Sequence, residues 1–176
     1  MTPEGYRVRL ASIDELARCT EIERRAAVRF ESVGLAEVMA TVVTPTDALA
    51  KGVRERGLFV ATHPDDGVVG FALVTELDGE AHLLELDVLP EHGRKGLGRT
   101  LVIATLAWGY GHKLPRMTLS TLDFVAWNAP FYSSLGFRVL QEHELGEALR
   151  ATHARDRARG LPADGRVIMG RDLPRR

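Results

Sequence analysis

Three closely spaced glycines near the middle of the chain are the residues best suited to holding a ligand. They follow a strand-like stretch that ends at Pro90, an apolar helix-like stretch begins near the last of them, and they are Gly93, Gly96 and Gly98. Glycine lets backbone N–H groups approach a ligand with no side chain in the way. The helix start adds unpaired N–H donors and the positive end of the helix dipole. The pattern therefore predicts a site for a phosphate or pyrophosphate group.

Two other glycine motifs fit this loop less well. The dinucleotide-binding motif G-x-G-x-x-G needs a third glycine where Leu101 stands. The P-loop motif G-x-x-x-x-G-K-[ST] fits at two glycines and at Thr100, but Arg99 replaces its lysine. Arginine is a planar fork rather than a compact point charge, so the exchange is not conservative. A P-loop-type small kinase or NTPase, with Asp123 as magnesium ligand, is therefore the weaker alternative.

The loop and the strand before it resemble the pyrophosphate loop of the GNAT acetyltransferases. The family pattern is apolar-x-Val-x-Pro, followed after a few residues by R/Q-x-x-G-x-G/A. Residues 86–90 read Leu-Asp-Val-Leu-Pro, and Gly96 and Gly98 match the two glycines of the pattern. Gly93 stands where the family usually has arginine or glutamine, so one side-chain contact of the family is not expected here.

A second segment resembles the other signature of the family. Residues 128–137 read Asn-Ala-Pro-Phe-Tyr-Ser-Ser-Leu-Gly-Phe, and the family motif N…FYxxLGF opens a short helix that leads into a strand. The asparagine of the motif lies seven residues before the tyrosine, where this chain has Val125, whereas Asn128 lies four residues before Tyr132. We therefore expect Asn128 to cap the helix, with a contact to the cofactor as the alternative.

The expected order of elements is also that of the GNAT fold. Ser12 predicts a helix start, with Glu15 as its capping-box partner. Hydrophobic periodicity and turn residues predict the remaining elements. The predicted strands are 6–10, 58–62, 68–76, 81–88, 117–121, 137–141 and 166–171, and the predicted helices are 12–30, 45–56, 98–110, 128–135 and 147–159.

The resemblance implies a mixed α/β (α+β) GNAT fold in a single domain over residues 1–176. Its mostly antiparallel twisted sheet has about seven strands, flanked by helices and splayed at the acetyl-CoA site. We expect the splay at a bulge near Asp87 and Val88, where freed backbone groups bind the pantetheine arm. The N–H near Val88 would then polarise the thioester carbonyl.

Acetyl-CoA is the expected co-substrate. Arg94, Lys95 and Arg99 are expected to neutralise its phosphates, with ordinary surface charge as the alternative. The residues expected to bind it are Leu86, Asp87, Val88, Gly93, Arg94, Lys95, Gly96, Leu97, Gly98, Arg99, Thr100 and Asn128.

Tyr132 occupies the position at which GNAT enzymes often carry a general acid. Its phenol would return a proton to the departing coenzyme A thiolate. The alternative is that its ring only packs beside Phe131 at the helix start.

His82 is the expected base. Residues 81–88 resemble the A-H-x-x-x-L-x-V strand of serotonin N-acetyltransferases, whose histidine helps to remove the amine proton. A histidine titrates near neutral pH and can relay a proton from an ammonium group through water. The alternative is a surface histidine at a strand end.

The alternation of this strand determines which side chains lie beside His82. With a period of two, one face carries His82, Leu84, Leu86 and Val88. Glu85 and Asp87 then lie on the opposite face, as solvated or salt-bridged carboxylates. Either becomes a second choice of base if the bulge reverses the alternation.

Phe30 and Glu31 are the expected contacts to the acceptor, because the acceptor pocket of the family begins after the first helix. They suit a cationic acceptor with an apolar body, and a polyamine, an amino acid, an antibiotic and a protein N-terminus all remain open. The helix over 147–159 either roofs this pocket or contacts a second copy of the chain. The six histidines show no metal-ligand spacing, so no metal is expected.

The composition is that of a soluble globular protein, with 45% apolar and 27% charged residues. The net charge of −1 gives no sign of a nucleic-acid-binding surface. Cys19 is the only cysteine, which excludes an internal disulfide and fits a reducing compartment. No signal peptide or membrane-spanning stretch is visible, so we expect a cytoplasmic protein without membrane partners.

Together these features predict an acetyl-CoA-dependent N-acetyltransferase. A primary amine attacks the thioester directly, in a ternary complex, with no metal and no covalent enzyme intermediate. The alternative is a degenerate GNAT module that holds an acyl-CoA without catalysis, which the displaced asparagine and Gly93 leave open.

Overall fold

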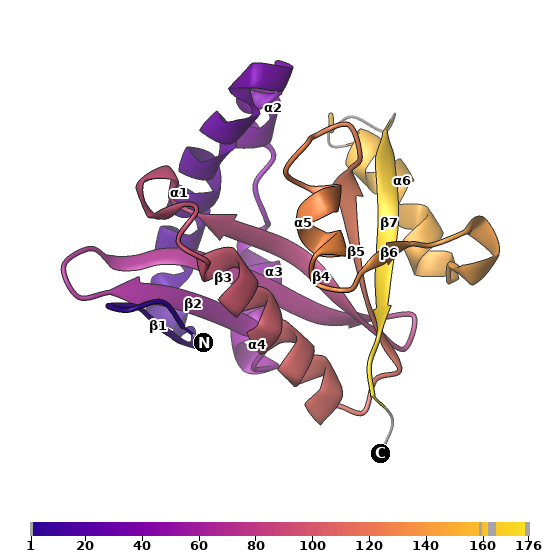
Figure 1. Cartoon of the computed structure of the whole chain (residues 1–176), viewed down its shortest axis with the longest axis horizontal. Coiled ribbons are helices and arrows are strands. Elements are labelled where there is room, and N and C mark those ends of the chain that lie inside the picture. Colours follow the sequence, from indigo (N-terminus) through magenta and orange to yellow (C-terminus); the bar gives the residue numbers. More distant parts are fainter. Residues whose placement is uncertain (1, 159, 162–164, 175–176) are drawn as a thin grey trace.

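The computed structural model describes residues 2–158, 160–161 and 165–174. Within them a seven-stranded sheet, in the order β1-β2-β3-β4-β5-β7-β6, carries helices on both faces (Figure 1). The strands are β1 Arg7–Leu10, β2 Leu58–His63, β3 Gly67–Leu77, β4 Glu80–Val88, β5 Arg116–Leu122, β6 Arg138–Val139 and β7 Arg166–Asp172. The helices are α1 Leu16–Ala26, α2 Ala36–Thr41, α3 Thr46–Arg54, α4 Leu97–Gly111, α5 Ala129–Ser133 and α6 Glu147–Ala158.

The predicted fold class is confirmed, with differences at the ends of elements. The Ser12 N–H does donate to the Glu15 carboxylate (2.9 Å), as the capping box requires. The first helix is shorter than expected, because after Ala26 the chain tightens into a 3-10 helix over Ala27–Val33. Gly34 ends this turn with a φ of 72°, in the left-handed region that favours glycine. The short helix α2 then follows, where the sequence predicts only a loop.

The core lies on both faces of the sheet. Its largest fully buried side chains come mostly from the strands and helices, and include Phe71 of β3, Ile22 of α1 and Leu101 of α4. Fully burying a side chain of this size contributes about 1.5–3 kcal/mol. None of the helices that the structure describes is long and apolar enough to cross a lipid bilayer.

The two central strands, β4 and β5, run parallel but stay together over only a short distance. Ala81, His82 and Leu83 pair with residues 117–119, and no pairing continues beyond Leu119 among the described residues. The remaining strand pairs of the described sheet are antiparallel. The sheet is therefore splayed in its middle, as predicted, from Leu83 onward.

A β-bulge lies at the start of the splay rather than near Asp87 and Val88, where the sequence prediction put it. Leu73 pairs with Glu85 and Val74 pairs with Leu83, so Leu84 is an extra residue in β4. One extra residue reverses the alternation of a strand beyond it. The bulge therefore decides which side chains face which helices.

The reversed alternation corrects the expected faces of β4. Glu85 and Asp87 lie on the same face as His82, and all three line one pocket. Leu86 faces the opposite side, toward α4, because a Cβ added to Gly98 of α4 would lie 4.0 Å from its Cδ2 atom. The prediction that Leu86 and Val88 share a face with His82 is therefore wrong, whereas Leu84, the bulged residue, lines the pocket together with His82.

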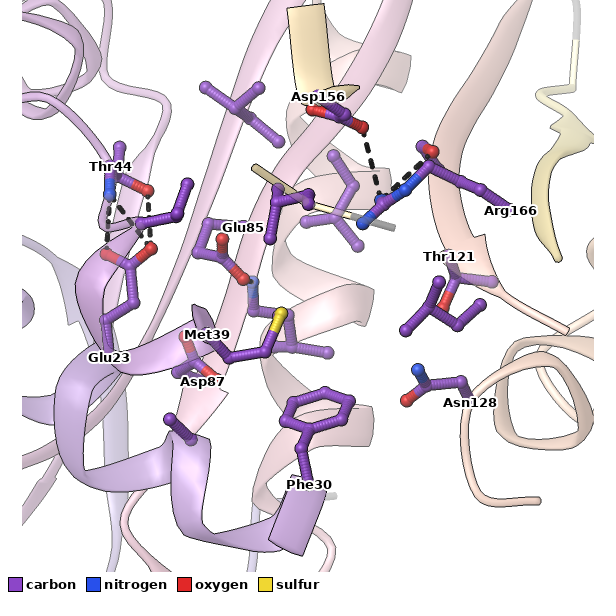
Figure 2. Close-up of a pocket in the computed structure, with 18 of the residues that line it drawn as sticks. Glu23, Phe30, Met39, Thr44, Glu85, Asp87, Thr121, Asn128, Asp156 and Arg166 are labelled. Carbon is purple, nitrogen blue, oxygen red and sulfur yellow. Dashed lines mark hydrogen bonds and ion pairs between the residues drawn. The ribbon is translucent and has the colours of Figure 1, made fainter. Parts of the chain in front are cut away.

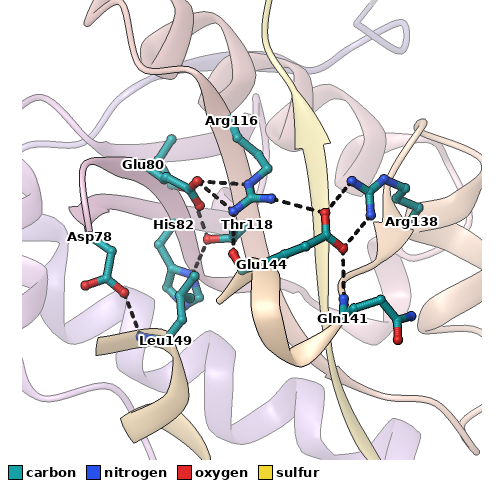
Figure 3. A network of polar contacts seen from close by, with 10 residues as sticks. Asp78, Glu80, His82, Arg116, Thr118, Arg138, Gln141, Glu144 and Leu149 are labelled. Carbon is teal, nitrogen blue, oxygen red and sulfur yellow. Dashed lines mark hydrogen bonds and ion pairs between the residues drawn. The ribbon is translucent and has the colours of Figure 1, made fainter. Parts of the chain in front are cut away.

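The turn between β3 and β4 fixes the start of α6. The carboxylate of Asp78 accepts hydrogen bonds from the N–H groups of Ala148 (3.1 Å) and Leu149 (2.9 Å) (Figure 3). A carboxylate in this position satisfies N–H groups that the first helical turn leaves unpaired.

An ion network ties the segment before α6 to the sheet (Figure 3). Arg116 of β5 pairs with Glu80 of β4 (2.7 Å) and donates to the carbonyl of Glu144 (2.9 Å). Glu144 in turn pairs with Arg138 of β6 (2.7 Å). These contacts hold α6 against the same face of the sheet as α1.

Candidate active site

A pocket of about 170 Å³ lies where β4 and β5 separate, between α1 and α6 (Figure 2). Since a buried water needs roughly 10–15 Å³ of such space, the pocket has room for a small molecule or the end of a side chain. Helix α6 contributes Thr152 and Asp156 to its wall, and β4 contributes the residues from His82 to Asp87. The prediction that the 147–159 helix roofs a pocket therefore holds for its described part.

Three carboxylates meet on one side of the pocket. Glu23 comes from α1, and Glu85 and Asp87 come from β4 (Figure 2). One carboxylate oxygen of each lies within 4.8 Å of the others. Like charges this close, taken out of water, favour the protonated forms.

Glu23 is buried, and its carboxylate is held in place by Thr44. Its carboxylate accepts hydrogen bonds from the N–H (2.9 Å) and the hydroxyl (3.1 Å) of Thr44. Burial and the charge of Glu85 nevertheless raise the pKa of Glu23 to about 8. Glu23 therefore titrates near neutral pH, where a proton-transferring group is most effective.

Asp87 is the one member of the group with a cationic partner. Its carboxylate forms an ion pair with Arg29, which also donates to the Leu86 carbonyl (3.4 Å) and lies over the Phe30 ring (5.2 Å). Burial and Glu85 raise the pKa of Asp87, and Arg29 opposes this shift. Neither Glu23 nor Glu85 has a lysine or arginine partner among the described residues.

His82 lies at the inner end of the pocket and is only 2% exposed, so it is not the surface histidine of the alternative interpretation. Its Nδ1 lies 2.9 Å from the hydroxyl of Thr118, which also donates to the Ala81 carbonyl (3.3 Å). Nδ1 therefore carries the hydrogen and Nε2 holds the lone pair. Burial, with a smaller effect of the Arg155 charge, lowers the pKa of His82 to about 4. The ring is thus neutral at pH 7.

Tyr132 of α5 is among the residues that line the pocket. Its ring packs edge-on against Phe131 (5.0 Å between centroids) and Phe137 (6.0 Å). Burial raises its pKa well above the ordinary value for tyrosine, and the charges of Glu85 and Asp87 act in the same direction against that of Arg29. The phenol is therefore protonated at neutral pH and is able to donate.

Beyond the bulge, β4 offers backbone groups on the edge that β5 has left. The Leu89 N–H donates to the Val69 carbonyl of the β3 side (2.9 Å). Because neighbouring residues of an antiparallel ladder direct their N–H groups to opposite edges, the Val88 N–H points toward the gap. The Leu86 N–H points there too and donates to the Glu85 carboxylate (3.0 Å). An extended ligand can pair with this edge as an added strand would.

The glycine loop leads from this edge to the start of α4. A 3-10 turn over Pro90–His92 precedes Gly93, and Arg94 and Gly96 take positive φ values of 58° and 85°. Helix α4 then begins at Leu97, one residue before the predicted start. The Leu97 side chain is buried in the core, so this residue can contribute only its backbone N–H to a ligand.

The basic residues of the loop differ in their surroundings. Arg94 and Arg99 are exposed, and no carboxylate among the described residues pairs with either. Lys95 instead donates to the Tyr6 hydroxyl (3.1 Å), which lies 2.8 Å from Nδ1 of His92. His92 in turn lies 3.4 Å from Asp66 through Nε2. The sequence analysis did not single out Tyr6 or His92, because their segments are far apart in the chain and carry no shared pattern.

The sequence comparison assigns the middle of the chain to a known family. Residues 54–139 match the model described as Acetyltransferase (GNAT) domain. The chain carries a GNAT domain. This range includes the bulged strand, the glycine loop and most of the segment around Tyr132. The P-loop interpretation is therefore wrong.

Solved GNAT structures share the fold over nearly the whole chain. The PaiA N-acetyltransferase from Thermoplasma acidophilum, in complex with coenzyme A, is 18% identical with a TM-score of 0.70, over 95% of this chain and 98% of that one. The ribosomal-protein-S18-alanine N-acetyltransferase from Escherichia coli is 18% identical with a TM-score of 0.66, over 97% of this chain and 96% of that one.

A third structure is longer. It is N-acetylglutamate synthase from Neisseria gonorrhoeae, complexed with coenzyme A and N-acetyl-glutamate. The match covers 97% of this chain but only 35% of the synthase, with 18% identity and a TM-score of 0.71. At such identities these likenesses establish the fold alone.

The structure places three of the predicted site residues differently with respect to the pocket. Phe30 lines the pocket, but Glu31 is exposed and lies outside the pocket lining. Asn128 stands at the N-cap position of α5 without a capping hydrogen bond from its side chain, and it lines the pocket instead (Figure 2). The capping interpretation of Asn128 is therefore wrong for its side chain.

Glu23 is the pocket residue that the sequence analysis missed. A signal was present, because Glu23 lies in the apolar stripe of α1 with Leu16, Cys19 and Ala26, at helical spacing. A carboxylate in such a stripe is buried on folding, and burying it without a cationic partner costs free energy. A bound cationic ligand would offset this cost.

We predict that Glu23→Gln makes the protein relatively more stable as the pH rises. The folded-state pKa of Glu23 is raised from 4.5 to about 8, so the folded protein retains a proton that the unfolded chain has released. The free energy of unfolding of the wild type should therefore fall between about pH 4.5 and pH 8, and glutamine removes this loss. We expect a relative gain of about 1–3 kcal/mol at pH 8, measured by urea unfolding at pH 5 and pH 8.

The exposed Glu31→Gln is the matched control and should leave the pH dependence unchanged. Parallel stability curves for wild type and Glu23→Gln would show that the Glu23 carboxyl titrates normally.

Proposed function

We propose that the protein transfers the acetyl group of acetyl-CoA to a primary amine in a ternary complex. The observation that carries this proposal is the separation of β4 from β5 after Leu83, which leaves an unpaired strand edge between the glycine loop and an acidic pocket. The edge suits a pantetheine arm, the loop suits a pyrophosphate, and the pocket suits an ammonium group. The coenzyme A complexes of similar structures support the choice of donor.

The same edge suggests how the thioester is activated. The Val88 N–H would donate to the thioester oxygen, which gains charge as the amine adds to the carbonyl carbon. The C–N bond forms, the C–S bond breaks, and the Tyr132 phenol gives its proton to the departing sulfur. The raised pKa of Tyr132 supports this role, because it keeps the proton available at neutral pH.

The amine must lose a proton before it attacks, and His82 and Glu85 are the candidate bases. We favour Glu85. The bulge at Leu84 brings it to the pocket face, beside Glu23 and Asp87, whereas burial lowers the pKa of His82 to about 4 and makes it a weak base.

Acetyl-CoA binding tests the proposal directly. Gly98→Val should weaken acetyl-CoA binding at least about tenfold, roughly 1.4 kcal/mol, as measured by isothermal titration. A Cβ at Gly98 would lie 3.5 Å from Phe131 and 4.0 Å from Leu86, which are ordinary contacts, so the protein accommodates it. The branched side chain would nevertheless stand in the glycine loop, where the pyrophosphate is expected to approach backbone N–H groups.

Gly111→Val, in the same helix, is the matched control, because an added Cβ there meets nothing within 4 Å. ATP with Mg²⁺ should not bind. A wild-type protein that does not bind acetyl-CoA, or a folded Gly98→Val that binds it normally, would refute the assignment of the donor site.

Tyr132→Phe tests the general acid. It retains the ring packing and removes only the hydroxyl, so turnover should fall roughly ten- to a hundredfold with little change in acetyl-CoA affinity. The defect should shrink with an acyl donor whose thiol has a lower pKa, because that thiolate leaves without a proton. An equal slowing of wild type and variant with both donors would make Tyr132 a packing residue.

Exchanging each candidate base for glutamine separates their roles. Glu85→Gln should lower turnover by about a hundredfold or more, with the loss shrinking as the pH rises and more of the amine is already neutral. His82→Gln should cost less than about tenfold, and the exposed Glu76→Gln on β3 is the control. A larger loss in His82→Gln than in Glu85→Gln would identify His82 as the base.

A further inference from the structure

The charges that line the pocket do not cancel. Two of its acids have arginine partners: Asp87 pairs with Arg29, and Asp156 pairs with Arg166 (3.3 Å) (Figure 2). His82 is neutral at pH 7, because its pKa is lowered to about 4. The two remaining acids, Glu23 and Glu85, have no lysine or arginine partner among the described residues. Burial and the charge of Glu85 raise the pKa of Glu23 to about 8, so without a ligand Glu23 keeps a proton at pH 7 that a bound cation would displace.

The neighbours of these two acids cannot balance them. Glu23 accepts from Thr44 and shares a hydrogen bond with Glu85, and Glu85 also accepts from the Leu86 N–H beside it. None of these donors is a cation. Burial and the charge of Glu85 raise the pKa of Glu23. Such a rise is expected when two carboxylates share a buried site without a cation.

The rest of this side of the pocket is apolar. Phe30, Met39 and Val42 line it next to the acids. Such a wall suits methylene groups. The two arginines of the lining, Arg29 and Arg166, are paired with Asp87 and Asp156, so a carboxylate on the acceptor would have to compete for them. The lining thus combines two carboxyl groups that have no cationic partner with a surface for a short hydrocarbon chain.

We propose that the acceptor is a small aliphatic diamine in its doubly protonated form, with the reacting ammonium at Glu85 and the second ammonium at Glu23. This inference rests on the acetyl transfer proposed above. A doubly charged amine gives each of the two carboxylates a cation, with Glu23 releasing its proton as the second ammonium binds, whereas an amino acid would bring a carboxylate against them. Glu23 is then the residue that selects the acceptor, and Glu85 is the one that deprotonates it.

The proton balance fits this division. The reacting nitrogen releases two protons as the C–N bond forms and the C–S bond breaks. One replaces the proton that Tyr132 gives to the sulfur, and the other leaves through Glu85 to solvent. The second ammonium keeps its charge and stays with Glu23 throughout.

Three probes with matched chains test the inference. Butylamine is putrescine without its second ammonium, and ornithine is putrescine with an added carboxylate. Each is titrated calorimetrically into the full chain in the presence of coenzyme A, and coenzyme A release from acetyl-CoA is measured in parallel. Putrescine should bind at least about tenfold more tightly than butylamine, as one added ion pair in a buried pocket predicts, and ornithine should bind more weakly than putrescine.

Glu23→Gln should remove the preference for putrescine over butylamine by raising the KM for putrescine. Glu76→Gln should keep the preference. Equal binding of putrescine and butylamine, equal binding of ornithine and putrescine, or a preference that survives Glu23→Gln would overturn the inference. A clear preference for putrescine without coenzyme A release from any amine would instead overturn the proposed function.

Discussion

One extra residue in one strand determines the chemistry of the pocket. Without the bulge at Leu84, the alternation of β4 would turn Glu85 and Asp87 toward α4 and bring Leu86 and Val88 into the acidic pocket. With it, His82 and both carboxylates share a face, and the apolar side chains pack under α4. The same bulge lies where β4 and β5 part. The reactive edge and the acidic pocket therefore have a common origin in the strand register.

The bulge also explains which parts of the site could be predicted. The glycine loop and the Phe131–Tyr132 segment are local patterns, and the structure contains the elements that they predict. The faces of β4 were misassigned because strict period-two alternation was assumed along the whole strand, although two adjacent leucines, Leu83 and Leu84, interrupt the polar–apolar alternation at the bulge. The partners of a loop are hidden when they come from distant segments, as Tyr6 does for Lys95.

Glu31 and Glu23 illustrate a different limit. Both are glutamates near the end of the first helical segment, and only their helical phase separates a solvent-exposed carboxylate from a buried one. The family resemblance pointed to a region that contributes to the pocket, and helical periodicity would have selected Glu23, which lines it. Burial of Glu23 against two other carboxylates is unfavourable for folding, so its presence argues for a ligand rather than for stability.

The contacts that hold α6 in place are independent of the glycine loop and of the splayed edge. Asp78, Arg116 and Glu144 fix the helix from the end of the sheet away from the glycine loop, through contacts that involve neither the loop nor the splayed edge. Residues on the inner side of α6 can therefore change, and alter the lining of the pocket, without disturbing the glycine loop or the splayed edge. The connection between β6 and β7 is thus a place where the pocket can vary independently of the proposed donor site.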